Sequence, residues 1–181
     1  HSDEVTRLLP EVLTRERSAL VLFTSWRQLN AVTKALPEEV VEGLLVQGDG
    51  SKQALILEHR RRIDEGECSH LVGLASFSEG LDLPGDYCRH VVIVKLPFAV
   101  PDDPVDQAIA EWAEAQGRNP FYEISVPDAA LKLVQACGRL IRNERDYGTV
   151  TMLDKRIVTQ RYGQALIDSL PPFRLDIAPL R

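Results

Sequence analysis

The sequence predicts an α/β domain, a parallel sheet flanked by helices on both faces. Short apolar runs of strand length, such as Ser18–Phe23 and His90–Lys95, alternate with helical stretches of about a dozen residues. These runs are apolar at nearly every position, which is typical of strands buried on both faces of a parallel sheet. Ligands of such open sheets bind at the carboxyl ends of the strands, so the segments after the strands are the first places to look for a site.

Length and composition narrow the class of protein. The 181 residues fit one domain, or one domain with an insertion, and 44% hydrophobic residues suffice for a sizeable core. With 27 acidic and 21 basic residues the net charge is −6. This argues against nucleic-acid binding by bulk electrostatics but allows a local basic groove. No run of about 18 apolar residues and no signal peptide is present, so we expect no membrane span and a cytoplasmic location.

The cysteines and histidines show no metal-ligand spacing. Three cysteines lie far apart without a CxxC pair, at Cys68, Cys88 and Cys137. An odd, scattered set inside apolar runs predicts reduced thiols in the core. The four histidines are equally scattered, so we assign no metal site.

The first half of the chain is expected to alternate helices and strands. Residues 3–16 read as a short helix that Pro10 kinks or ends. After the strand Ser18–Phe23, Thr24 or Ser25 is a suitable N-cap for a helix over Trp26–Leu36. A strand, a helix and a further strand then follow at Val40–Gln47, Lys52–Asp64 and Cys68–Leu74.

The second half contains an interruption. After a loop over Ala75–Tyr87 and the strand His90–Lys95, a proline-rich start and a helix at Val105–Gln116 form an insertion at about residues 97–127. A strand at Thr149–Leu153 and a helix at Ile157–Leu170 complete the domain. We therefore expect an N-terminal helix (1–17, with His1-Ser2 a candidate cloning remnant), the domain proper (18–172) and a tail (173–181).

The octapeptide Gln135–Arg142 is the first candidate for chemistry. At about 100° per residue, one helix face would present the polar set Gln135, Gly138, Arg139 and Arg142. Arginine stays protonated and offers a rigid fork of donors that suits phosphate. Two such forks beside a glutamine resemble a clamp for a polyanion. The alternative is an ordinary solvated face of an amphipathic helix.

The loop Ser76–Gly85 is the second candidate. Glu79 and Asp82 flank Gly80, a residue that lets the backbone approach a ligand closely. A carboxylate here can accept hydrogen bonds from ribose hydroxyls, or it can anchor one of the arginines. The alternative is a plain polar loop closed by a turn at Pro84-Gly85.

Taken in order, three segments resemble motifs IV, V and VI of the second RecA-like motor domain of superfamily 2 helicases. They are Phe23-Thr24-Ser25, Ser78-Glu79-Gly80-Leu81-Asp82, and Gln-x-x-Gly-Arg-x-x-Arg at 135–142. The form of the second segment, with Asp146-Tyr147-Gly148 and Asp154-Lys155-Arg156, is similar to the XPD/DinG branch. The segment from Val46 to Phe77 resembles DinG-type DNA helicases in particular. The resemblance extends from about Ser18 to Pro172.

The resemblance implies a RecA-like fold and roles for single residues. Arg139 and Arg142 would reach ATP phosphates across an inter-domain cleft, one of them as an arginine finger. Gln135 would link the nucleotide state to domain closure. The nucleotide-facing residues would be Glu79, Gly80, Asp82 and Gly138. The contacts to DNA would come from Ser25, Trp26, Arg27 and Ser76, with Trp26 either stacking on a base or packing half-buried. Arg60–Arg62 would be a solvated face or a weak phosphate contact.

Several parts of such an ATPase are missing from this sequence. It has no G-x-x-x-x-G-K-[ST] loop, no DEAH-like metal-binding segment and no cluster of four cysteines. We therefore expect ATP and Mg²⁺ to be bound mainly by a separate N-terminal RecA-like domain, which is also where an iron–sulfur cluster would belong. The expected partners are single-stranded DNA, ATP and that domain, and the chain alone is expected to be inactive.

The resemblance implies 5′–3′ translocation on single strands and a role in DNA repair or replication. Two alternatives stay open. One is an RNA helicase fragment or a nuclease–helicase fusion of the family, although the Ser-Glu-Gly-Leu-Asp loop argues against the DEAD-box type. The other is a non-catalytic module that binds single-stranded DNA, or a partner protein through residues 97–127.

Overall fold

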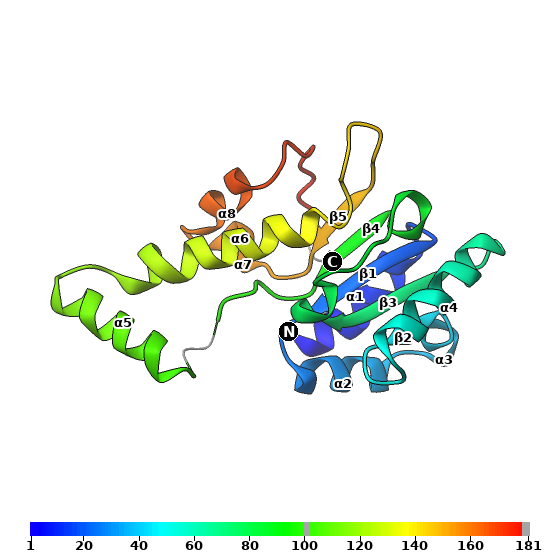
Figure 1. The fold of residues 1–181 in the computed structure, drawn as a ribbon, viewed down its shortest axis with the longest axis horizontal. Coiled ribbons are helices and arrows are strands. Elements are labelled where there is room, and N and C mark those ends of the chain that lie inside the picture. Colours follow the sequence, from blue (N-terminus) through cyan, green and yellow to red (C-terminus); the bar gives the residue numbers. More distant parts are fainter. Residues whose placement is uncertain (100–101, 179–181) are drawn as a thin grey trace.

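The sheet is parallel throughout. The structure, a computed structural model, describes residues 1–99 and 102–178. In that part of the chain five strands pair in the order β2-β3-β1-β4-β5 (Figure 1). Their bounds are β1 Ser18–Phe23, β2 Leu44–Val46, β3 Ser69–Leu74, β4 His90–Ile93 and β5 Thr149–Met152. The predicted fold class is confirmed.

Helices cover both faces of the sheet, and β1 shows how its side chains divide. Leu20 and Leu22 belong to a core shared with α4 (Lys52–Asp64), α6 (Val126–Cys137) and α8 (Gly163–Ser169). The alternate residues Ala19, Val21 and Phe23 pack with α1 (Ser2–Leu13) and α2 (Trp26–Ala35). Because side chains of a strand alternate in direction, one continuous apolar strand supplies both cores.

Several boundaries agree with the sequence prediction. β1 and α4 have the predicted bounds. Ser25 is the N-cap of α2, and its Oγ accepts a hydrogen bond of 3.3 Å from the backbone N–H of Gln28. Pro10 does not end α1, which continues to Leu13. Burial of one face of this helix on the sheet outweighs the backbone hydrogen bond that proline cannot donate.

Two predicted elements were wrong. The segment predicted as a strand at Val40–Gln47 begins inside the short helix α3 (Glu38–Val41), and only the three residues of β2 pair with β3. The predicted helix Ile157–Leu170 is instead α7 (Arg156–Thr159) followed by α8. The break allows Gly163 to lie against the Ile157 carbonyl, where a Cβ would clash.

Helix α6 also ends earlier than predicted. Its last residue is Cys137, and Gly138 is the C-cap. Arg139–Arg142 therefore continue as a turn and not as part of a regular helix face. Glycine favours this ending because it stabilises a helix interior less than other residues do. The turn is closed by hydrogen bonds from the N–H groups of Leu140 and Ile141 to the Cys137 carbonyl.

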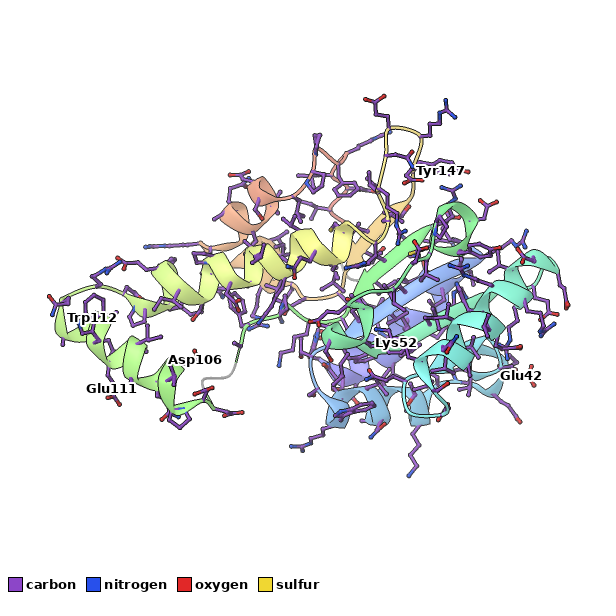
Figure 2. The ribbon with its side chains drawn as sticks, in the orientation of Figure 1. Glu42, Lys52, Asp106, Glu111, Trp112 and Tyr147 are labelled. Carbon is purple, nitrogen blue, oxygen red and sulfur yellow. The ribbon has the colours of Figure 1, made fainter. Side chains whose placement is uncertain are left out.

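The region between β4 and α6 projects from the body of the molecule (Figure 1). It contains α5 (Pro104–Ala115) and a π-helical turn, η3 (Phe121–Ser125), that leads directly into α6. Figure 2 shows Asp106, Glu111 and Trp112 on α5, away from Lys52 on the sheet body. The exposed large apolar residues of α5 are Val105, Ile109 and Trp112.

The cysteines differ in part from the prediction. Cys88 and Cys137 are buried thiols, and burial raises their pKa values to about 12 and about 11. Cys68 is exposed, because it precedes β3 and does not belong to the strand. In the described part of the chain, no helix is long and apolar enough to cross a membrane.

Candidate functional site

The two motif arginines converge on a single peptide group. Arg139 Nη1 and Arg142 Nη2 donate hydrogen bonds of 3.1 and 3.0 Å to the carbonyl oxygen of Leu81. Arg142 Nη1 also pairs with the carboxylate of Asp82. The turn after α6 therefore brings both guanidiniums to the loop after β3, although the residues are about 60 positions apart in sequence.

A carboxylate fixes the backbone of the turn that carries Arg142. The N–H groups of Arg142 and Asn143 donate to Oδ2 of Asp146, at 2.8 and 3.1 Å. The side chain of Asn143 in turn accepts a hydrogen bond of 2.9 Å from the N–H of Arg145. This is local side-chain-to-backbone bonding of the kind that makes Asp and Asn favourable in turns.

The Asp82 carboxylate is the charged centre of this group. Its side chain is 72% exposed, while that of Arg142 is 27% exposed. The hydrogen bond and positive charge of Arg142 lower the pKa of Asp82, and the charge of Arg60 acts in the same direction. The carboxylate therefore stays ionised and holds the guanidinium at the surface, where another anion can compete for it.

Glu79 and Gly80 connect this group to the end of β3. Both are exposed, and Lys52 at the start of α4 donates to the Glu79 carbonyl oxygen. Gly80 has φ +70°, a left-handed conformation that favours glycine, and no atom within 4 Å of the position of a Cβ. Gln135 and Gly138 are also exposed, at the end of α6.

A second group of predicted residues lies where β1, β2 and β3 end. A shallow pocket of about 350 Å³ brings Trp26 and Ser76 together, and it is lined by Trp26, Gln47, Gly48, Gly50, Lys52, Ser76 and Phe77. Gln47 joins two strand ends, because its Oε1 accepts a 2.8 Å hydrogen bond from the N–H of Leu74. Trp26 is 44% exposed, so its ring is available to a ligand. Ser25 and Arg27 flank it and are exposed.

The structure thus divides the predicted residues into two groups instead of gathering them at one edge. Trp26 and Ser76 lie at the strand ends, whereas Arg139 and Arg142 meet Asp82 on the face covered by α4 and α6. The Ser76–Asp82 segment joins the two groups.

Sequence reasoning missed two basic residues. Arg60 was predicted to be a solvated charge or a weak phosphate contact, but it bonds to Asp82 and stacks on an aromatic ring. Its neighbour Arg61 is solvated, bridging the carboxylates of Glu58 and Glu65. Lys52 was not singled out either. The sequence feature that could have identified Lys52 was its position directly after Ser51, the N-cap of α4, shortly after the carboxyl end of β2.

The described residues do not suit a resident metal centre. Among them, no group of three His, Cys, Asp or Glu side chains is placed to hold an ion. The three cysteines are separate thiols, so this part of the chain lacks the set of four that an iron–sulfur cluster needs.

Comparison with known proteins gives the family. The family model described as "Helicase C-terminal domain" matches residues 9–173. The chain belongs to this family. It is 48% identical over 176 residues to the "ATP-dependent DNA helicase DinG" of Photobacterium profundum, covering 96% of this chain and 25% of that protein. It is 43% identical over 157 residues to the protein of the same name from Escherichia coli K12, covering 87% and 22%.

Solved structures support the RecA-like fold of this helicase domain. An XPD helicase superposes with a TM-score of 0.71 at 20% identity, over 93% of this chain and 30% of that one. Xpd4 of S. tokodaii gives a TM-score of 0.66 at 19% identity, over 94% and 33%. This helicase C-terminal domain spans about a quarter of the length of the curated relatives it matches.

Proposed function

We propose that this chain is the second motor domain of an ATP-dependent helicase that translocates on single-stranded DNA. Arg139 and Arg142 would complete an ATP site whose other half lies on an N-terminal RecA-like domain of the longer protein. The observation that carries this proposal is the convergence of both guanidiniums on the Leu81–Asp82 peptide. They are held side by side, permanently charged, by groups that a phosphate can replace.

In this proposal the arginines act on the phosphates. One of them serves as an arginine finger that stabilises charge on the transferring phosphoryl group. Gln135 links the nucleotide state to domain closure, and the remaining nucleotide-facing residues are Glu79, Gly80, Asp82 and Gly138. ATP and Mg²⁺ are bound mainly by the other domain, to which any iron–sulfur cluster would also belong.

The pocket at the ends of β1, β2 and β3 is the proposed contact with DNA. Trp26 offers an exposed ring for a base, and Lys52 brings a positive charge to the same pocket. Ser76 in the pocket, with the exposed Ser25 and Arg27 next to Trp26 in sequence, would supply donors for the phosphate backbone. The names of the curated relatives favour DNA over RNA as the strand. The 5′–3′ direction, the role in DNA repair or replication and the cytoplasmic location remain predictions.

Single substitutions in the longer protein test this function. Arg139→Ala and Arg142→Ala should each abolish most DNA-stimulated ATP turnover, and the substitution that removes the arginine finger should lower it by about 10³-fold or more. Binding of single-stranded DNA should change less than threefold, since the DNA pocket is separate. Arg145→Ala is the matched control, an exposed arginine in the same loop. Turnover that survives both substitutions would contradict the proposal.

A non-catalytic binding module is the second candidate, and the exposed apolar residues of α5 favour it. It predicts that the longer protein binds DNA or a partner protein, and that Arg139→Ala and Arg142→Ala leave its ATP turnover unchanged. The same two variants therefore separate the candidates.

A further inference from the structure

Arg60 contacts the loop on which the two motif arginines converge. Its Nη2 donates to the carbonyl oxygen of Asp82 and lies 3.8 Å from Oδ2 of the same residue. Its guanidinium is 5.1 Å from the centre of the Tyr87 ring. One side chain of α4 therefore contacts the backbone, the carboxylate and a neighbouring ring of this loop.

The ring beneath Arg60 is itself fixed to the body of the domain. The Tyr87 hydroxyl donates a 2.7 Å hydrogen bond to Oδ1 of Asp64 on α4. The Tyr87 carbonyl accepts a 2.6 Å hydrogen bond from Nε2 of His59, whose Nδ1 accepts from the Ser69 hydroxyl at 2.8 Å. Because a carbonyl can only accept, this network defines the tautomer of the buried histidine. Arg60 thus rests on a rigid support.

Two consecutive peptide groups lie between two sets of arginines. Arg60 holds the Asp82–Leu83 peptide from α4, through the Asp82 carbonyl oxygen, and Arg139 and Arg142 hold the Leu81–Asp82 peptide from the turn after α6, through the Leu81 carbonyl oxygen. Leu81 is buried, so the peptide cannot follow the arginines freely toward solvent. The Nε of Arg60 is buried, although 35% of its side chain is exposed, so this arginine is partly packed against the domain.

We propose that Arg60 is a positioning residue for ATP hydrolysis. It fixes Asp82 through the carbonyl oxygen of that residue, and the adjoining Leu81 carbonyl holds Arg139 and Arg142 together in one orientation. This inference rests on the proposed function, because it matters only if those arginines act on ATP. In this inference Arg60 acts through Asp82 and is assigned no contact with the nucleotide. Its loss would leave both guanidiniums present but less well oriented, which lowers the rate of the chemical step more than it weakens ATP binding.

The test compares neighbouring arginines in the longer protein. Arg60→Ala should lower kcat about tenfold while KM for ATP and the affinity for single-stranded DNA change less than about twofold. Arg61→Ala removes the same charge from the same helix without touching the loop, and its kcat should stay within about twofold. Arg60→Lys keeps the charge but not the fork, and it should recover kcat to within about threefold of the wild type.

A second matched pair keeps the test decisive if Arg60→Ala does not fold. Arg60→Lys should then show a measurable loss of kcat, and Arg61→Lys should show none. The inference is overturned if Arg60 and Arg61 variants behave alike, or if Arg60→Ala raises KM with kcat unchanged. It is also overturned if thermal unfolding shows that the loss of kcat in Arg60→Ala equals the loss of folded protein in that variant. If Arg142→Ala leaves turnover intact, the proposed function itself has failed, which is a different result.

Discussion

Two buried histidines make the stability of the domain depend on pH. His70 and His90 lie on the strands either side of β1, both in register with Ala19. The pKa of each is lowered to about 4, chiefly by burial, with smaller contributions from repulsion by His59 and His90 at His70 and by Arg15 at His90. The folded state therefore favours neutral rings, and acid favours the unfolded state, whose histidines titrate near 6.5.

The direction of this effect can be measured by urea unfolding of the chain between pH 7.5 and 4. Because the folded pKa values lie below the unfolded ones, stability should be full above about pH 7 and fall as pH drops toward 4. At pH 4 each histidine should cost about 3 kcal/mol relative to neutral pH. His90→Gln should flatten the profile. An urea midpoint that does not move over this range would contradict the burial of neutral rings.

The two tryptophans provide a matched test of the DNA pocket. Trp26 lines the pocket with Lys52, whereas Trp112 lies on the projecting α5. In the longer protein, single-stranded DNA should quench the fluorescence of Trp26, so the change should vanish in Trp26→Phe and persist in Trp112→Phe. Trp26→Ala should weaken binding by about 1–3 kcal/mol, the value of stacking one base. Equal effects of both substitutions would exclude a specific role for this pocket.

How much of the site could be predicted differs from residue to residue. The pattern of motif VI pointed to Arg139 and Arg142, and the loop pattern raised Asp82 as a possible anchor. Arg60 could not be distinguished from Arg61, because three successive arginines on one helix carry no information about their partners. Only the packing of α4 against the loop at Asp82 separates them.

At the scale of elements, strands buried on both faces were the most predictable. β1 is apolar at almost every position because it supplies two cores at once. β2 is shorter and pairs with one neighbour only, so its pattern was confused with the preceding α3. The break before α8 depends on close backbone packing of Gly163 against Ile157, six residues earlier, and the exact last residue of α6 at Cys137 is a boundary that propensity alone does not fix.

The break between α7 and α8 yields a stability prediction. A Cβ at Gly163 would lie 2.0 Å from the Ile157 carbonyl oxygen, so Gly163→Ala must push two backbone segments apart. We expect a loss of about 2–3 kcal/mol in the free energy of unfolding, as for other overpacked sites. At Gly43 the nearest atom is 3.5 Å away, and Gly43→Ala should change stability by less than about 1 kcal/mol. Similar urea midpoints for Gly163→Ala and Gly43→Ala would contradict the inference that the break between α7 and α8 requires a glycine at position 163.

At the scale of the whole molecule, the charge distribution explains why binding must be local. The net charge is −6, yet each candidate group contains cations, with Lys52 at the pocket and Arg139 and Arg142 at the loop. The acidic remainder of the surface repels a polyanion, so affinity for DNA must come from few contacts and from stacking.

The isolated chain provides the final test, because it separates binding from turnover. With about two phosphate contacts, the slope of log K against log salt should be only about −1 to −2 for single-stranded DNA. A slope steeper than about −4 would require several more phosphate contacts than the proposed pocket provides. ATP hydrolysis should stay at background with or without DNA. In the proposed shared site, residues of both domains are needed to stabilise the negative charge on the ATP phosphates. If the chain alone hydrolyses ATP and Arg142→Ala abolishes that activity, the arginines act without a second domain and this prediction is wrong.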